Sequence, residues 1–102
     1  MSLNQFQKRR LRQIAHDLRP VVQTGGRGLT DSVLKEIDRA LHDHELIKVR
    51  LVADDREQRR AMIEKVCEHS GANLVQRIGH IAVFYRPNPD QPRISTQLEP
   101  SG

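Results

Sequence analysis

Hydrophobic and polar positions follow two different periods along the chain, and each change of period marks the end of a predicted element. From residue 4 to residue 18 the apolar positions recur every three or four residues, as in an amphipathic helix. Pro20 disfavours a helical conformation at Arg19 and so ends this helix. Residues 21–24 are rich in β-branched side chains and predict a short strand. The chain therefore begins with a helix followed by a strand.

A second helix and a second strand follow a glycine-rich stretch. Thr30 is a good N-cap, and the helical stripe behind it predicts a helix that runs to about His44. Residues 46–52 form the next predicted strand, in which apolar positions alternate with Lys48 and Arg50. The two basic side chains therefore share one face, and the apolar ones are expected to face a core.

A third helix and a hairpin complete the predicted fold. Residues 54–58 contain two overlapping capping boxes, and Ser70-Gly71 is a typical helix stop. Strands are predicted at 74–78 and 81–85, joined by a tight turn at Gly79-His80. The order α-β-α-β-α-β-β predicts an α/β fold, a two-layer sandwich with a four-stranded mixed sheet. We expect residues 1–87 to form this domain and the Pro-rich residues 88–102 to form a disordered tail.

Charge is distributed unevenly along the 102 residues, which suffice for one domain. The net charge is +4, but residues 1–28 carry six basic side chains and one acidic one, whereas residues 29–55 carry four basic and seven acidic ones. This polarity favours a polyanionic partner at the N-terminal part of the domain. The sequence has neither a long apolar run nor a secretory leader, so we expect a cytoplasmic protein without membrane contact. The single cysteine, Cys67, is expected to be a small buried side chain.

The stretch Gly25-Gly26-Arg27-Gly28 lies between the first strand and the second helix. Glycine allows a backbone to approach a ligand closely, and the N–H groups at the start of a helix are free donors for an anion. The spacing Gly25-x-x-Gly28 also fits the short G-x-x-G pattern with which KH-type modules bind a nucleic-acid backbone. An ordinary turn is the competing interpretation of this stretch when it is taken alone.

Several segments together resemble the CRM domain family, in particular its small single-domain bacterial members of the YhbY type. The matching segments are Leu18-Arg19-Pro20-Val21-Val22, Gly25-Gly26-Arg27-Gly28-Leu29-Thr30, Glu45-Leu46-Ile47-Lys48-Val49 and Gly79-His80 with Tyr85-Arg86-Pro87. The resemblance covers roughly residues 3–87. It implies a fold similar to the C-terminal domain of translation initiation factor three.

The resemblance also implies a function, namely RNA binding and association with precursors of the large ribosomal subunit. The residues expected to bind RNA are the loop, with the basic surface beside it: Gly25, Gly26, Arg27, Gly28, Lys8, Arg9, Arg12 and Arg19. Because Gly26 follows Gly25, Arg27 is the one residue inside the G-x-x-G with a side chain. Lys48 and Arg50 either extend this surface or are ordinary solvated charges. The charges Arg56, Arg59 and Arg60 are expected to be solvated helix side chains.

Other chemistry has little support in the sequence. His42 and His44 do not share a helix face and have no further ligand at zinc spacing, so we expect no metal, no cofactor and no catalytic residues. Three aromatic side chains offer no evident stacking platform, which favours recognition of RNA backbone and shape over a base code. We expect a monomer that binds no small-molecule substrate. The alternative function is a protein–protein adaptor on ribosomal precursors, acting through the acidic second helix or the tail.

Overall fold

The computed structural model describes residues 3–98 and contains three α-helices, four strands and a short 3-10 helix. Their order along the chain confirms the predicted α-β-α-β-α-β-β sequence and adds one element at its end. The elements are α1 (Gln5–Ala15), β1 (Pro20–Gln23), α2 (Asp31–His44), β2 (Leu46–Arg50), α3 (Arg56–Ser70), β3 (Asn73–Ile78), β4 (Ile81–Tyr85) and η1 (Ser95–Leu98).

The strands form one mixed sheet in the order β1-β2-β4-β3. β1 pairs with β2 in parallel, whereas β4 lies antiparallel to both β2 and β3. β2 and β3, which are connected through α3, are therefore not neighbours in the sheet. The hairpin at Gly79 and His80 turns the chain back, so that β4 lies between them. The α/β class with a four-stranded mixed sheet is confirmed, and β3 is left as an edge strand.

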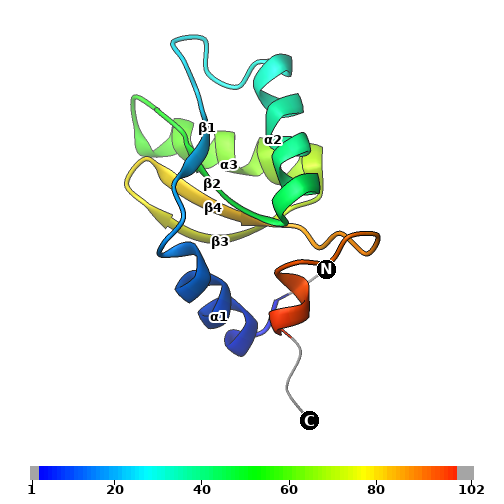
Figure 1. Cartoon of the computed structure of the whole chain (residues 1–102). Coiled ribbons are helices and arrows are strands. Elements are labelled where there is room, and N and C mark those ends of the chain that lie inside the picture. Colours follow the sequence, from blue (N-terminus) through cyan, green and yellow to red (C-terminus); the bar gives the residue numbers. More distant parts are fainter. Residues whose placement is uncertain (1–2, 99–102) are drawn as a thin grey trace.

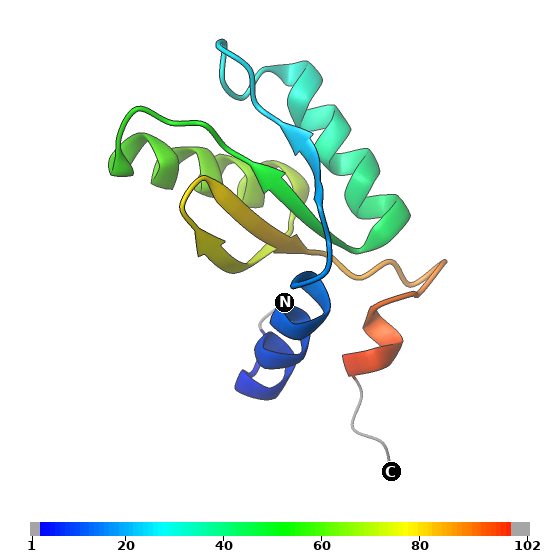
Figure 2. The same cartoon turned by 60° about the vertical axis from the view of Figure 1, so that its left-hand side comes forward.

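Two adjacent aromatic residues of β4 show that both faces of the sheet are covered. Phe84 belongs to the core beneath α2 and α3, and Tyr85 belongs to a second core beneath α1 and η1; neither side chain is exposed. Figures 1 and 2 show α2 and α3 on one side of the sheet and α1 on the other. The expected two layers are therefore extended by a partial third layer, because the apolar stripe of α1 packs on the opposite sheet face from α2.

Local sequence determines where the helices begin and end. The side chains of Asn4, Thr30 and Asp55 each accept a hydrogen bond from a backbone N–H of the first turn that follows. Gly71 ends α3 in the left-handed conformation, with a φ of +75°. These caps satisfy donors and acceptors that would otherwise be unpaired at helix ends, and they agree with the predicted boundaries.

Residues 88–98 depart from the expected disordered tail. The buried carboxylate of Glu45 accepts hydrogen bonds from the backbone N–H groups of Asn88, Arg93 and Ser95 at 2.6, 2.6 and 3.0 Å. Leu98 of η1 is buried against α1. We call residues 88–98 the C-terminal strap. Proline makes this segment irregular, but a buried acceptor and an apolar anchor hold it to the domain; the rest of the expected tail, residues 99–102, lies outside the described part.

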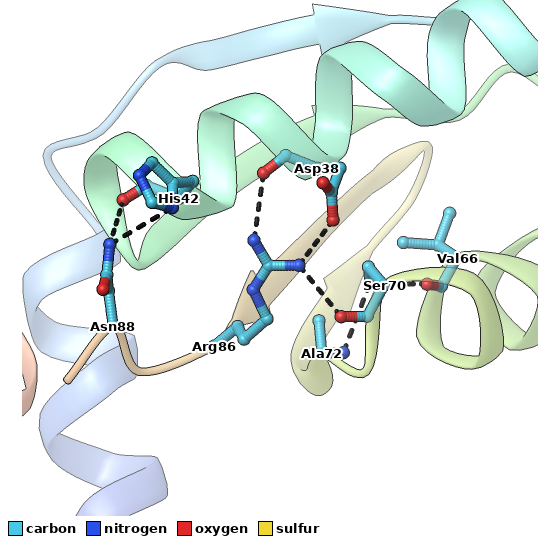
Figure 3. A network of polar contacts seen from close by, with 7 residues as sticks. All are labelled: Asp38, His42, Val66, Ser70, Ala72, Arg86 and Asn88. Atoms are coloured by element: carbon cyan, nitrogen blue, oxygen red, sulfur yellow. Dashed lines mark hydrogen bonds and ion pairs between the residues drawn. The ribbon is translucent and has the colours of Figure 1, made fainter. Parts of the chain in front are cut away.

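Arg86, two residues before this strap, joins the middle of α2 to the end of α3. Its guanidinium group donates to the Asp38 carboxylate at 2.6 Å, to the Asp38 carbonyl oxygen at 3.0 Å and to the Ser70 carbonyl oxygen at 2.9 Å (Figure 3). Ser70 ends α3, and Asp38 belongs to α2. The planar fork of arginine suits such a set of acceptors, so Arg86 has a structural role in the packing of α2 and α3.

Candidate nucleic-acid interface

The glycine loop begins at a firmly held residue, Thr24. Its backbone N–H donates to the carbonyl oxygen of Arg50 at 2.9 Å, and its buried hydroxyl accepts from the N–H of Val52 at 2.9 Å. Both partners belong to β2 or to the residues just after it. The loop therefore leaves the sheet from a fixed point, although the loop itself extends into solvent.

The loop closes on itself between Gly25 and Gly28. The N–H of Gly28 donates to the carbonyl oxygen of Gly25 at 3.0 Å, and Gly28 has a φ of +71°. A Cβ at any of the three glycines would meet nothing within 4 Å. Gly25, Gly26 and Arg27 are exposed. Of the three, only Gly28 requires glycine for its backbone conformation, whereas Gly25 and Gly26 are exposed glycines with open space around them.

A groove lies between α1 and the sheet. Its volume is about 590 Å³, and its basic side chains are Arg9, Arg12, His16 and Lys48. The remaining lining is formed by Gln13, Gln76, Ile78, Ile81 and Val83. Basic side chains thus stand beside an apolar floor formed by β3 and β4, and this basic lining suits a polyanionic partner. We call this feature the groove.

Two cations of β2 connect the groove to the glycine loop. Lys48 lies in the groove and donates to the carbonyl oxygen of His16 at 3.5 Å. Arg50 is exposed two positions further along the strand, on the same face as Lys48, and pairs in register with Gln23. Gln23 is followed by Thr24, whose N–H bonds to Arg50. Basic side chains therefore continue across the sheet from α1 to the start of the loop.

The predicted basic residues do not all meet at one place. Arg9 and Arg12 line the groove, but Lys8 does not, and Arg19 lines a different hollow with His44 and Arg93. Both views show the turn between β1 and α2 at one end of the molecule and α1 at the other (Figures 1 and 2). The loop and α1 are therefore not adjacent, contrary to their placement in the sequence-based interpretation. The helical spacing of Arg9, Arg12 and His16 could reveal a shared face, but not its neighbours on the sheet.

The aromatic side chains divide into two kinds. Phe84 and Tyr85 are wholly buried, whereas Phe6 of α1 is 56% exposed. Phe6 lies one helical turn before Arg9, at the end of the basic face of α1. Of the aromatic residues in this chain, Phe6 is thus the one whose ring is accessible to a base.

His42, one of the two histidines for which no metal was expected, is hydrogen-bonded to the C-terminal strap. The side-chain amide of Asn88 donates to the carbonyl oxygen of His42 at 2.9 Å and lies 3.4 Å from its Nδ1 (Figure 3). Among residues 3–98, no group of three or more His, Cys, Asp or Glu side chains is placed to hold a metal ion. In the same residues, no helix has the length and apolar character needed to cross a bilayer.

Comparison with known proteins gives relatives that cover nearly the whole chain. A probable RNA-binding protein of Pseudomonas aeruginosa is 48% identical over 89 residues, which are 87% of this chain and 86% of that protein. An RNA-binding protein of Haemophilus influenzae is 48% identical over 87 residues, 85% of this chain and 88% of its own length. A probable RNA-binding protein of Bacillus subtilis is 38% identical over 88 residues, with coverages of 86% and 92%.

A solved structure supports the same assignment. The solution structure of a Staphylococcus aureus protein superimposes with a TM-score of 0.75 at 36% identity, covering 85% of this chain and 91% of that one. The sequence profile of the CRS1/YhbY (CRM) domain matches residues 3–86, the range from just before α1 through Arg86. The chain belongs to the CRS1/YhbY (CRM) domain family.

Proposed function

We propose that this protein is a non-catalytic RNA-binding protein that acts in assembly of the large ribosomal subunit, as a cytoplasmic monomer associated with ribosomal precursors. The observation that carries the RNA-binding part is the groove with its basic lining, continued by Lys48 and Arg50 to the glycine loop. The names of the relatives support RNA as the partner. The ribosomal part rests on the family resemblance of the sequence.

In this proposal, Arg9, Arg12 and Lys48 bind phosphates in the groove, while the loop contacts the RNA backbone at the far end of the same path. The exposed N–H groups around Gly26 and the side chain of Arg27 serve as donors there. Contacts of this kind position an RNA without reading its sequence. The burial of Phe84 and Tyr85 supports recognition of backbone and shape over base stacking on the sheet.

The test removes the three groove cations with Arg9→Gln, Arg12→Gln and Lys48→Gln together. The matched control removes three exposed cations outside the groove: Lys35→Gln, Arg39→Gln and Lys65→Gln. Affinity for fragments of large-subunit rRNA is measured by fluorescence anisotropy over a range of salt concentrations. We expect the groove variant to bind more weakly and its salt dependence to fall by roughly two to three in log–log slope, since each phosphate contact contributes close to one. Equal affinities for the groove variant and the control would refute the groove as the binding surface.

The assembly role is tested by sucrose-gradient fractionation of cell extracts with and without RNase. We expect the protein to migrate with large-subunit precursors and to leave those fractions when the RNA is digested. Co-migration that survives complete digestion would favour the adaptor alternative. Part of what an adaptor would use is engaged within the chain, because Asp38 of α2 bonds to Arg86 and the C-terminal strap bonds to Glu45.

A further inference from the structure

A second cluster of arginines lies away from the groove and the glycine loop. Arg56, Arg59 and Arg60 come from the first two turns of α3, and Arg77 comes from β3. Together with Ile63, Glu64 and Leu74 they line a hollow of about 380 Å³, which we call the Arg pocket. The three helix arginines were expected to be independent solvated charges; the structure brings a fourth arginine from a different element to join them.

The Arg pocket lies on the opposite side of the sheet from the groove. In the β3–β4 register Arg77 pairs with Ala82, which belongs to the core beneath α2 and α3. Ile78, the next residue, pairs with Ile81, and both line the groove. Because neighbouring side chains of a strand point to opposite faces, the edge strand β3 separates two basic hollows.

The charges of the Arg pocket are poorly compensated within the protein. Its one carboxylate, Glu64, forms an exposed ion pair with Arg60 at 3.7 Å. Within residues 3–98, Arg56, Arg59 and Arg77 form no ion pair. The start of a helix also disfavours cations, because the helix dipole is positive at that end. Carboxylates also lie at this end of α3, at Asp54, Asp55 and Glu57, but within residues 3–98 none of them forms an ion pair with these arginines. The arginines are therefore available to bind an external anion.

Arg59 carries a specific unmet requirement. Its Nε is buried and has no hydrogen-bond partner in the described part of the chain, while its Nη2 lies 3.4 Å from His80 Nδ1. A buried donor without an acceptor costs stability. The guanidinium fork matches phosphate oxygens better than other common acceptors, and its flat face also stacks on bases. The side chain is thus partly fixed where it lines the Arg pocket.

We propose that the Arg pocket is a second binding site for RNA phosphates, so that one protein molecule holds two RNA segments, one on each side of β3. This inference rests on the proposed function, since the groove is taken as the first RNA site. RNA is favoured over an acidic protein segment because the arginines line the pocket together with Leu74, an apolar side chain that is 37% exposed and on which a base can lie. An RNA-binding protein with two such sites would bring together segments distant in the RNA sequence.

The experiment measures bridging of two RNAs by the full chain. A biotinylated rRNA hairpin is immobilised, protein is added below saturation, and capture of a second, fluorescent hairpin is recorded; native mass spectrometry counts the molecules in the complex. The test variant combines Arg56→Gln, Arg60→Gln and Arg77→Gln, all exposed positions, and leaves Arg59 in place. The matched control is Lys35→Gln, Arg39→Gln and Lys65→Gln, which removes the same charge elsewhere.

We expect the wild type and the control to capture the second hairpin in complexes of one protein and two RNAs. The pocket variant should lose this capture, keep its affinity for the first hairpin and unfold at the wild-type temperature. Bridging by the pocket variant at the wild-type level, or equal loss in the control, would overturn the inference. Polyglutamate binding gives a further test. If polyglutamate binds the wild type but not the pocket variant, and polyglutamate does not reduce bridging by the wild type, the pocket is a site for protein and the inference is overturned.

The groove variant separates this inference from the proposed function. If the wild type binds one hairpin through the groove but never two, the second site fails and the proposed function stands. If the wild type binds no RNA, both fail. If the groove variant still binds one hairpin and this remaining binding disappears when the pocket arginines are also replaced, the two sites are separate, as proposed.

Discussion

The carboxylate of Glu45 accepts a hydrogen bond of 2.6 Å from the backbone N–H of Asn88, which lies 43 residues further along the chain. The same carboxylate accepts from the N–H groups of Arg93 and Ser95 and from the Ser95 hydroxyl. Glu45 follows α2 directly and has a φ of +65°. One buried side chain at the junction of α2 and β2 therefore holds the C-terminal strap on the domain.

Replacing Glu45 by alanine should destabilise the protein by about 3 kcal/mol, because several buried donors lose their acceptor and each such loss costs about 1–3 kcal/mol before the strap relaxes into water. Urea unfolding followed by circular dichroism measures the change. Glu68→Ala is the matched control, since Glu68 is an exposed glutamate near the end of α3. Equal midpoints for the two variants would show that the strap contributes nothing to stability.

Low pH should weaken the attachment of the C-terminal strap to Glu45. Burial on its own raises the pKa of Glu45, but the hydrogen bonds from the backbone N–H groups of Asn88, Ser95 and Arg93 outweigh it and leave the pKa below its ordinary value of 4.5. The unfolded chain recovers the ordinary pKa, so the stabilisation is complete above pH 4.5 and is lost as pH falls through the lowered folded value. Unfolding free energies of the wild type and Glu45→Gln, measured against pH, should therefore converge in acid. A difference that stays constant across this range would contradict the assignment.

The strap shows where sequence reasoning reaches its limit. The periodicity of apolar positions was enough to predict the three helices, the four strands and the hairpin, because each of these depends on local spacing and capping residues such as Thr30 and Asp55. The segment after Arg86 has no period, and its prolines are typical of disorder. Nothing near it in sequence indicates that its N–H groups find an acceptor at Glu45, since that partner is supplied by tertiary folding alone.

Arg86 should stabilise the contact between α2 and α3. Arg86→Ala removes a donor from the carbonyl oxygens of Asp38 and Ser70 as well as an ion pair, and we expect a loss of about 2 kcal/mol in unfolding free energy, reduced by the partial exposure of Asp38. Arg86→Lys should recover little of it, because an ammonium group cannot reproduce the planar fork. Arg93→Ala, the loss of an exposed arginine, serves as the control in thermal unfolding. A full recovery by lysine would show that charge alone matters.

The candidate interface was predictable in part. Helical spacing predicted one basic face for four side chains of the first helix, Lys8, Arg9, Arg12 and His16, and all but Lys8 line the groove. Strand alternation placed Lys48 and Arg50 together. Their assembly into the groove depends on α1 lying on the opposite side of the sheet from α2, which the local pattern does not encode. For the same reason the sequence suggested that the basic helix and the glycine loop are neighbours, although the two lie at opposite ends of the molecule (Figure 1).

Substitutions at Gly26 and Gly28 of the glycine loop should affect different properties, RNA affinity at Gly26 and stability at Gly28. Gly26 is exposed, has no positive φ and has free space for a Cβ, so Gly26→Asp should leave the melting temperature unchanged. Its carboxylate would face RNA phosphates, and like charges about 4 Å apart in water repel by roughly 1 kcal/mol, which corresponds to an affinity loss of roughly fivefold. Anisotropy titrations with rRNA fragments measure this loss, and Gly26→Ser is the neutral control.

At Gly28, unlike at Gly26, a substitution should lower the stability of the protein. The φ of +71° at Gly28 is a left-handed conformation that costs an alanine roughly 1–2 kcal/mol, so Gly28→Ala should lower the unfolding free energy by about that amount. An aspartate at Gly28 would combine strain with charge and could not separate the two effects, which makes Gly26 the better position for a charge test.

Unchanged RNA affinity in Gly26→Asp would exclude the loop from the interface and leave the groove as the binding surface. A drop in melting temperature for Gly26→Asp would instead show that the loop needs glycine for folding at both positions.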